Sequence, residues 1–446
     1  MTEPIVPSSK PRCSREDALA VLKRLRDAGH VAYFAGGCVR DELLGITPKD
    51  YDVATDAPPG RVRELFRNTQ AVGAAFGVIL VRQAKSIVEV ATFRSEGAYL
   101  DGRRPSEVHF TTAEEDAKRR DFTINGLFLD PVEEKVIDYV GGQEDLKKHR
   151  IRAIGIPAER FAEDFLRLLR AVRFAARFDF EIDPSTFDAI KQNAPKLAQI
   201  SPERIAEELR AMLVPPTRTR AARQLVASGL LAVIMRFMPE TTAAGQERCG
   251  VLKMMSPPHN QGSISFGAAL AAICLDYRIV ATGKLMIPHF TSSQESQRVA
   301  RALRQALKLS NEEVDQLTGV LTVRPLLQDP SVATMKRFLA EPTSTEACLL
   351  LEALARCDIM NMRISDVMGR LREIQARGPV APEPLLTGDH LVAAGWTPGP
   401  AFKRVLDQVY DAQLEDRIKT KPEALALAEQ LRPSPPPSPP RTGERG

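Results

Sequence analysis

The character of the chain changes once, near Ile154, and this change limits what the chain can fold into. Upstream of it, short runs rich in Val, Ile, Tyr and Phe alternate with helical patterns. Runs of this length are typical of strands, which we predict at His30–Ala35, Tyr51–Ala54, Phe76–Arg82, Ile87–Phe93 and Val136–Val140. Helical patterns lie at Arg15–Ala28, Val39–Leu44 and Gly60–Phe66. The upstream part is therefore predicted to be an α/β or α+β domain with a small mixed sheet.

Downstream of Ile154, long amphipathic helical patterns dominate and strand signals nearly vanish. Prolines separate these patterns, as expected where one helix ends and another begins. We predict an all-helical region from about residue 155 to about residue 430, with a helix–turn element at Thr387–Pro400. The final stretch, Arg432–Gly446, is rich in Pro and Ser and lacks apolar periodicity, which predicts disorder.

Composition restricts the compartment and the partners. The 446 residues are enough for two or more domains. The six cysteines form no CxxC pair, and the first residues contain no apolar signal-peptide segment, so we expect a reducing cytoplasm. The longest apolar run, Phe266–Leu275, is too short to span a bilayer. The formal net charge of +4 is too small to indicate nucleic-acid binding, so any such interface must come from local basic stripes.

The first motif with chemical meaning is a glycine pair, Gly36 and Gly37, between a predicted strand and a predicted helix. Glycines there allow backbone N–H groups to approach a phosphate closely, and a helix N-terminus favours negative charge. Arg40, one helical turn later, could add a charge-assisted bond to the same phosphate. A tight turn, with glycine needed only for its backbone conformation, is the alternative.

Carboxylates form the second motif. On a strand, Asp50 and Asp52 would point to the same face, where their mutual repulsion calls for a cation between them. Their hard oxygen ligands suit Mg²⁺. Glu89 stands among apolar residues in another predicted strand, and if the two strands are neighbours, three carboxylates meet, enough to hold two metal ions. Solvated acids on strand edges are the alternative for all three.

Two further segments carry paired polar groups. Arg119 and Arg120 precede Asp121 and Asn125, and such a group can clamp a triphosphate and orient a ribose. A charged first turn of a helix is the alternative interpretation. Farther along, Ser201-Pro202-Glu203 places Ser at an N-cap and Pro at the first helical position, which structure explains fully.

The segment that begins at Glu163 is predicted to start a long helix. Its polar face carries Glu163, Asp164, Arg167 and Arg170. A carboxylate can accept from the amino group of C or A, while a guanidinium donates to the adjacent ring acceptor, so Asp164 and Arg167 could select C and A against U and G. Such contacts contribute about 1–3 kcal/mol of discrimination each. An ordinary surface salt bridge is the alternative. Leu166 and Phe174 fall on the polar face, which predicts that another element covers them.

A basic stripe with helical spacing follows much later in the chain, at Arg298, Arg301, Arg304 and Lys308. It could contact an RNA backbone. A plain solvated helix face is the alternative.

Taken in chain order, the segments GGCVRD, DYD, RRDFTIN, EDFLR and SPER resemble the class II tRNA CCA-adding enzymes and their relatives, the bacterial poly(A) polymerases. The resemblance covers about residues 29 to 210. It implies a polymerase-beta-like nucleotidyltransferase head followed by a helical neck, body and tail. We place the head at residues 15–150, the neck at 151–215, the body at 216–380, the tail at 381–431 and a disordered terminus at 432–446.

The resemblance also implies roles for the polar residues of these segments. Asp50 and Asp52 match the metal-binding pair, and Glu89 fits the third carboxylate of the wider superfamily. Gly36, Gly37 and Arg40 match the triphosphate-side motif, and Arg120, Asp121 and Asn125 match the motif near the ribose and phosphates. Glu163, Asp164 and Arg167 match the segment that selects the base with protein instead of nucleic acid.

The implied reaction is addition of C and A to the 3′ end of tRNA, with CTP and ATP as substrates and Mg²⁺ as cofactor. No membrane or protein partner is expected. The segment Val72–Val78 lacks the arginines typical of poly(A) polymerases, and the polar loop Arg94–His109 favours full CCA addition. CC-only addition, A-only addition and poly(A) synthesis stay open. So do a non-catalytic RNA-binding protein on this scaffold and a small-molecule nucleotidyltransferase.

Overall fold

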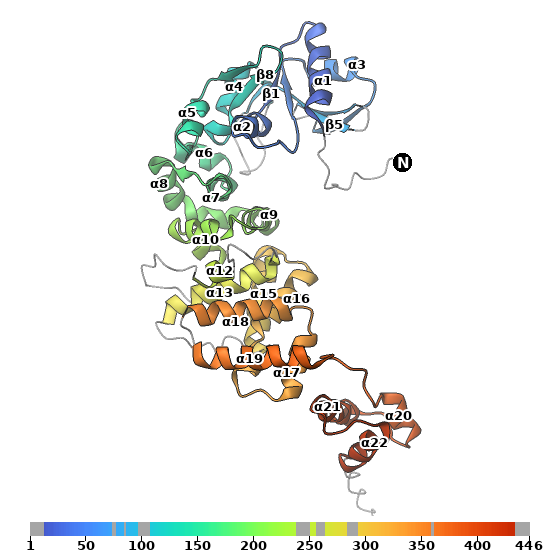
Figure 1. Ribbon diagram of the computed structural model, residues 1–446. Helices are drawn as coiled ribbons and strands as arrows, with labels where there is room; N and C mark the ends of the chain where they lie inside the picture. The colour runs from blue at the N-terminus through green and yellow to red at the C-terminus, as the bar shows by residue number, and fades with distance from the viewer. Residues whose placement is uncertain are drawn as a thin grey trace, which may run out of the picture. The chain divides into compact units, whose positions relative to one another are not determined.

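The computed structural model describes residues 13–73, 77–83, 86–96, 108–237, 250–255, 264–282, 293–357 and 361–432. The chain forms two compact units (Figure 1). The first contains residues 1–240 with 305–308, and the second contains residues 241–304 with 309–446. The predicted disordered terminus and most of the predicted loop, residues 97–107, lie outside the described part. The finer division into head, neck, body and tail stays a prediction.

A seven-stranded mixed sheet opens the first unit, which confirms the predicted fold class. Its order is β3-β4-β5-β2-β1-β8-β9. The strands are β1 (Ala32–Ala35), β2 (Val53–Thr55), β3 (Thr69–Gly73), β4 (Val78–Gln83), β5 (Ser86–Thr92), β8 (Leu127–Asp130) and β9 (Lys135–Asp138). Only β2 and β5 run parallel among these neighbours, with Val53 opposite Val90. This pairing brings the residues that precede Val53 and Val90 next to each other.

Helices cover both faces of the sheet. On one face lie α1 (Arg15–Asp27) and α3 (Pro59–Leu65), which contact the central strands and each other. The hydroxyl of Ser14 caps α1 by accepting a hydrogen bond from the N–H of Asp17. Val21 and Leu25 are buried residues of this helix. On the other face, α4 (Ala113–Lys118) packs against Phe93 and Phe128. The sheet therefore has an apolar core on each side.

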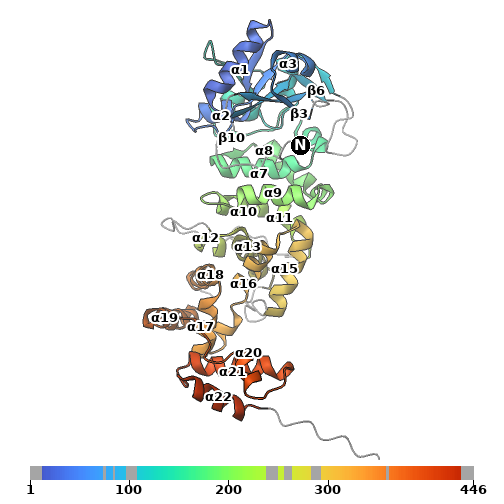
Figure 2. The same ribbon diagram turned by 90° about the vertical axis from the view of Figure 1, so that its right-hand side faces the viewer.

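Short helices follow the sheet. They are α6 (Pro157–Glu163), α7 (Leu166–Phe178), α8 (Pro184–Asn193), α9 (Pro202–Met212), α10 (Arg218–Ala227) and α11 (Leu230–Ile234). α7 packs against α9 and α10 (Figure 2). The prediction of an all-helical region from residue 155 is wrong at one place, since β11 (Glu181–Ile182) pairs in parallel with β10 (Arg150–Ile151). Two residues are too few to show a periodic signal, and tertiary packing decides their pairing.

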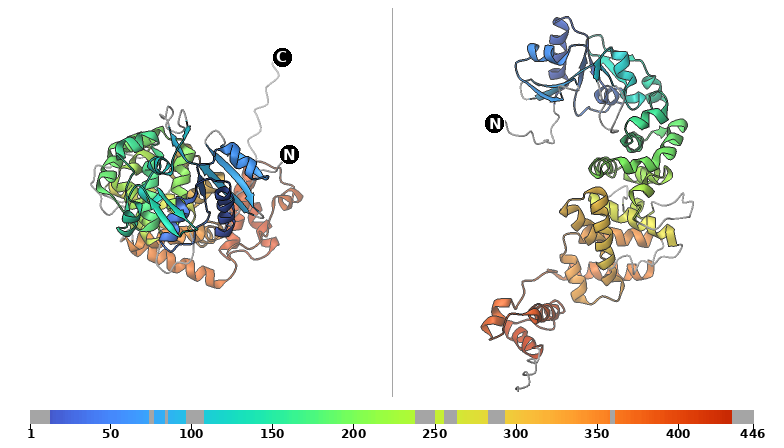
Figure 3. Two further views of the ribbon diagram at one scale, coloured as in Figure 1. Left: turned by 90° about the horizontal axis from the view of Figure 1, so that it is seen from above. Right: turned by 180° about the vertical axis from the view of Figure 1, so that it is seen from behind.

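The second unit is helical in its described residues. Its helices are α12 (Gly250–Met254), α13 (Phe266–Thr282), α15 (Ser293–Leu307), α16 (Asn311–Leu321), α17 (Val332–Ala340), α18 (Ser344–Arg356), α19 (Asn361–Arg377), α20 (Gly388–Ala393), α21 (Pro400–Leu414) and α22 (Lys421–Gln430). The last three lie together (Figure 3) around their own apolar cluster, which includes Leu391, Trp396 and Val405. The apolar run in α13 is buried core. Within the described ranges, no helix is long and apolar enough to cross a membrane.

Some strand predictions differ from the structure. β1, β2, β4, β5 and β9 lie within two residues of their predicted bounds, whereas β3 and β8 of the same sheet were not predicted. β8 lies between β1 and β9 and is buried along its whole length. A run buried on both faces shows no alternation, and that removes the signal on which strand prediction depends.

Two glycines in helices of the second unit test how closely the helices of that unit pack. A Cβ at Gly267 would lie 2.6 Å from the Cβ of Gln316, because α13 and α16 approach closely there, whereas a Cβ at Gly369 in α19 meets nothing within 4 Å. Gly267→Ala should lower the free energy of unfolding by about 1–3 kcal/mol. Gly369→Ala should raise it by about 0.5–1 kcal/mol. Urea unfolding of both variants checks this, and equal effects would contradict the close approach of α13 and α16.

Candidate active site

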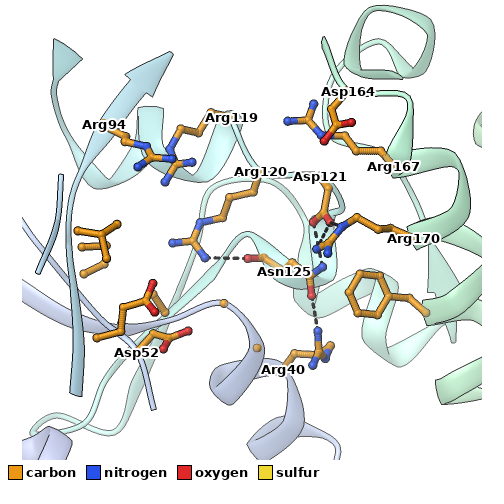
Figure 4. Close-up of a pocket in the computed structure, with 18 of the residues that line it drawn as sticks. Arg40, Asp52, Arg94, Arg119, Arg120, Asp121, Asn125, Asp164, Arg167 and Arg170 are labelled. Carbon is orange, nitrogen blue, oxygen red and sulfur yellow. Dashed lines mark hydrogen bonds and ion pairs between the residues drawn. The ribbon is translucent and has the colours of Figure 1, made fainter. Parts of the chain in front are cut away.

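A pocket of about 850 Å³ lies in the first unit, between the sheet and the helices that follow it (Figure 4). Charged side chains dominate its lining. The arginines are Arg40, Arg94, Arg119, Arg120, Arg167, Arg170 and Arg204, and the carboxylates are Asp52, Glu89, Asp121 and Asp164. An excess of guanidinium groups over carboxylates in a concave site favours a polyanionic ligand.

Asp52 and Glu89 form the acidic part of the pocket. They immediately precede Val53 and Val90, which are paired across the parallel strands β2 and β5. The predicted adjacency of these two segments is thus confirmed. The prediction that Asp50 and Asp52 lie within a strand is wrong, because β2 begins at Val53.

β2 begins only at Val53 because its partner strand β1 ends opposite Asp52. β1 ends at Ala35, whose N–H donates to the carbonyl of Asp52 at 3.0 Å, and at Gly36 the chain turns away. The alternation of faces nevertheless persists, since Tyr51 and Val53 are buried while Asp50 and Asp52 are half-buried.

The carboxylates offer a partial metal site. Across the described residues, no group of three or more His, Cys, Asp or Glu side chains is placed to hold a metal ion. Of the three predicted carboxylates, Asp52 and Glu89 line the pocket and Asp50 does not, so a site formed by all three stays a prediction. A pair of carboxylates still fits Mg²⁺, which usually takes one or two from the protein and completes its shell with water and substrate phosphates. The donor set at Asp52 and Glu89 therefore suits Mg²⁺ in the presence of a phosphate ligand.

The two glycines of the turn differ in their constraints. Gly36 has φ +72°, a backbone conformation that strains any other residue, and a Cβ there would lie 2.6 Å from Nη1 of Arg120 and displace that guanidinium. Its N–H donates to the carbonyl of Leu127 at 3.0 Å and is committed to the sheet. At Gly37 a Cβ would meet only an ordinary contact, 3.6 Å from Arg40. Gly36 thus leaves room for Arg120, while Gly37 opens α2 (Gly37–Leu43) beside the pocket.

Arg40 lines the pocket but is engaged by the protein. It is buried, and its three nitrogens donate to Oδ1 of Asp41 and Oδ1 of Asn125. Its guanidinium lies over the rings of Phe174 and Phe178, 5.3 and 4.6 Å from their centroids. Burial lowers the pKa of Arg40 despite the neighbouring Asp41. Arg40 therefore supports Asn125 and joins α2 to α7, and its binding of a triphosphate stays a prediction.

Asp121 and Arg170 form the ion pair that joins the sheet to α7. Arg170 donates to Oδ2 of Asp121 from Nε at 2.8 Å and from Nη2 at 2.7 Å. Nδ2 of Asn125 donates to the other oxygen at 2.9 Å. Burial raises the pKa of Asp121, but Arg170, Asn125 and the N–H of Phe122 outweigh it and lower the pKa to about 2. Asp121 is therefore a fixed negative charge that orients Asn125 and Arg170.

The predicted long helix at Glu163 is interrupted, so the prediction that Glu163, Asp164 and Arg167 share one helix face is wrong. α6 ends at Glu163, Asp164 is extended with φ −154° and ψ 106°, and α7 begins at Leu166. Oδ1 of Asp164 accepts from the N–H of Leu166 at 3.0 Å, so the acid stabilises the start of the second helix.

The break separates the polar side chains into two pairs. Oδ2 of Asp164 accepts from Nη2 of Arg204 at 2.6 Å, while Arg167 donates to Glu163 and to the carbonyl of Arg160. Asp164 and Arg167 line the pocket, and Glu163 stands behind them and does not. The side chains proposed to read a base are thus each held by a neighbour of opposite charge or by a carbonyl.

Among the charged and aromatic lining residues, Arg94, Phe174 and Arg204 were not predicted as site residues, and Arg119 was named only with Arg120 as part of a possible triphosphate clamp. Phe174 was noted for its place on a polar face, and its burial against Arg40 and Phe122 confirms the prediction that another element covers it. Arg204 belongs to the segment at Ser201 that capping preferences explained fully. The N-cap and Pro positions are confirmed, but one turn later the same helix places Arg204 in the pocket.

The basic stripe belongs to the region of α15. Arg298, Arg301 and Arg304 are exposed on that helix, and Lys308 is exposed directly after it. Val299, Leu303 and Leu307 are buried on the opposite side, as the predicted amphipathic pattern requires. The contact of this stripe with RNA stays a prediction.

Comparison with known proteins identifies the class of the fold. Residues 32–152 match the family described as "Poly A polymerase head domain", and residues 179–244 match "Probable RNA and SrmB- binding site of polymerase A". The solved structure of the Bacillus stearothermophilus CCA-adding enzyme in complex with CTP has a TM-score of 0.68 and 29% identity, and it covers 93% of this chain and 97% of that chain. The fold is thus that of a poly(A) polymerase-type head with helical domains.

Curated relatives define the family more closely. The CCA-adding enzyme of Lacticaseibacillus paracasei is 32% identical over 88% of this chain and 90% of its own length. The chain therefore belongs to the family of CCA-adding enzymes. The CCA-adding enzyme of Streptococcus suis is 40% identical over 261 residues, 58% of this chain, and that match spans only 64% of the relative.

The ion pair between Asp121 and Arg170 predicts a pH dependence. The folded-state pKa of about 2 lies below the ordinary 3.8, so the ionised carboxylate stabilises the fold fully above pH 3.8 and loses this effect as the pH falls through 2. Asp121→Asn should cost at least about 2 kcal/mol near neutral pH. The difference in free energy of unfolding between Asp121→Asn and the wild type should become smaller as the pH falls from 4 to 2. Urea unfolding at a series of pH values measures this, and a constant difference would contradict it.

Proposed function

We propose that this protein adds C and A nucleotides to the 3′ end of tRNA, using CTP and ATP and releasing pyrophosphate. The observation that carries the proposal is the pocket, in which Asp52 and Arg120 lie on one side while Asp164 and Arg167 lie on the other (Figure 4). Glu89 also lines this pocket. A nucleoside triphosphate has the same polarity, with phosphates at one end and a base at the other. The names of the curated relatives and the CTP in the Bacillus stearothermophilus structure support these substrates.

Asp50 and Asp52, with Glu89, are the residues we propose to hold Mg²⁺. Bound there, two such ions would supply activation of the tRNA 3′-hydroxyl and neutralisation of charge on the leaving pyrophosphate. Arg120 can bind the triphosphate, and Asn125, held by Arg40 and Asp121, can orient the ribose. The protein contributes mainly position and charge, as phosphoryl transfer requires little covalent chemistry from an enzyme.

Asp164 and Arg167 are the proposed base-selecting residues. An ionised carboxylate only accepts hydrogen bonds, so Asp164 can accept from the amino group of C or A and repels the carbonyl oxygen of U or G. Arg167 only donates, which suits the adjacent ring nitrogen of C or A. Glu163 assists by holding Arg167.

The remaining proposals concern the tRNA and the compartment. Arg298, Arg301, Arg304 and Lys308 would contact the tRNA backbone through charge, without reading sequence. A cytoplasmic location is supported by the free thiols of Cys13, Cys38, Cys274 and Cys348.

The test is single-nucleotide analysis of products from tRNA that lacks the terminus, ends in C or ends in CC. With CTP and ATP together, all three should be extended to CCA. Products that stop at CC, or extension only of the substrate ending in CC, would assign the narrower CC-only or A-only activity. A long A tail would assign poly(A) synthesis.

The double variant Asp50→Ala, Asp52→Ala should abolish incorporation, because the proposed metal ligands are lost, while tRNA binding is spared. Primer extension and a gel-shift assay measure the two. Asp56→Ala is the matched control, since Asp56 lies exposed just beyond β2 and outside the pocket. Retained incorporation would refute the metal assignment. Loss of activity in the control as well would indicate a folding defect.

Arg204→Gln should weaken base selection, because Asp164 loses the cation that orients it. The preference for CTP over UTP, as a ratio of kcat/KM values, should fall roughly tenfold, about the contribution of one edge contact. Arg220→Gln is the control, since Arg220 makes comparable 2.6 Å pairs with Asp179 and Glu181 outside the pocket. An unchanged ratio in Arg204→Gln would show that this pair does not affect selection.

A further inference from the structure

A buried carboxylate, Asp116, lies behind the arginines of the pocket. It stands on α4 and is 1% exposed, and it is not itself a lining residue. A carboxylate so deeply buried is costly unless it is paired. Its partners therefore indicate what it is there to do.

Both oxygens of Asp116 are taken by arginines of the pocket. Oδ1 accepts from Nε of Arg119 at 2.9 Å and lies 2.8 Å from its Nη2, and it also accepts from the backbone N–H of Arg94 at 3.2 Å. Oδ2 accepts from Nε and Nη2 of Arg120 at 3.2 and 2.9 Å. One side chain thus fixes the positions of two guanidinium groups and the backbone of a third arginine.

These arginines lie together at the phosphate end of the pocket. Figure 4 shows Arg94 and Arg119 side by side, with Arg120 between them and Asn125. Arg120 is further held by its bond to the carbonyl of Asn125 at 3.2 Å and by the ring of Phe128, 5.0 Å away. The guanidinium groups of these arginines repel one another. The negative charge of Asp116 offsets this repulsion when no anion is bound.

Asp116 stays ionised in this setting. Burial raises its pKa, but the charges of Arg120 and Arg119 outweigh burial and lower it. The three arginines carry three positive charges and Asp116 carries one negative charge, so two positive charges remain. A ligand with a single carboxylate would neutralise only one of them. A chain of phosphates matches these charges better, because a guanidinium binds phosphate oxygens in pairs.

We propose that Asp116 is a positioning residue that arranges Arg94, Arg119 and Arg120 to hold the triphosphate of the incoming nucleotide. This inference rests on the proposed function and adds residues to it. It places the base at Asp164 and Arg167, so the triphosphate and the base are bound by separate groups of the same pocket. Loss of Asp116 should therefore weaken the binding of every nucleoside triphosphate equally and leave base selection unchanged.

The variant Asp116→Asn keeps the shape of the side chain and removes its charge. We expect the dissociation constants of CTP and ATP to rise roughly tenfold, the effect of losing one charge-assisted contact. The affinity for cytidine, which has no phosphate, and the CTP-to-UTP preference in incorporation should stay unchanged. Titration calorimetry with the full-length protein and competition by cytidine measure these values.

Asp130→Asn is the matched control. Asp130 is also a buried carboxylate of the first unit and pairs with Arg26 at 2.7 Å, but it lies outside the pocket. It should lower thermal stability without changing the ratio of CTP to cytidine affinity. A second variant, Arg119→Gln, removes one guanidinium without burying a new charge, and it should show the same selective loss for CTP should Asp116→Asn fail to fold.

The outcomes separate the inference from the proposed function. If the wild type prefers CTP to cytidine and Asp116→Asn and Arg119→Gln keep that preference, the inference fails and the proposed function stands. Equal loss of CTP and cytidine affinity in Asp116→Asn would indicate a merely structural role and also overturn it. If the wild type itself does not distinguish CTP from cytidine, both the inference and the proposed function are overturned.

Discussion

The ion pair between the buried Asp121 and the partly buried Arg170 is the interaction on which the pocket depends. It joins the segment before β8 to α7 and holds Asn125 through the second oxygen of the same carboxylate. Arg40 adds a parallel connection, since it donates to Asn125 and lies over Phe174 of α7. Removing Arg170 would leave the buried charge of Asp121 without its main partner, which makes this junction costly to alter.

Many of the arginines that line the pocket are backed by carboxylates farther from the cavity. Arginines face the cavity, and carboxylates such as Asp116 and Asp41 stand behind them and fix their direction. Without this support, seven guanidinium groups around one cavity would repel each other and spread. Preorganised cations need no reorientation when a phosphate chain enters, and this is how a site with few reactive groups can still favour phosphoryl transfer.

Local patterns predicted much of the fold because they have local causes. The helix at Arg15–Asp27 follows from an apolar stripe and a Ser cap, and β5 follows from its apolar alternation. The break at Asp164 could not be predicted in this way, since helical spacing continues through it. There the chain leaves the helix because Asp164 bonds both to the N–H of Leu166 and to Arg204, which is 40 residues away in sequence.

By itself, the sequence determined the mixed sheet, the helical remainder and most of the side chains that line the pocket, because each motif keeps its order along the chain. Only the tertiary structure decided which carboxylates meet, with Asp52 and Glu89 in the pocket and Asp50 outside it. It also decided that Arg204 belongs there. The reason is that pairing between strands and packing between helices join residues distant in sequence, and no local pattern encodes those partners.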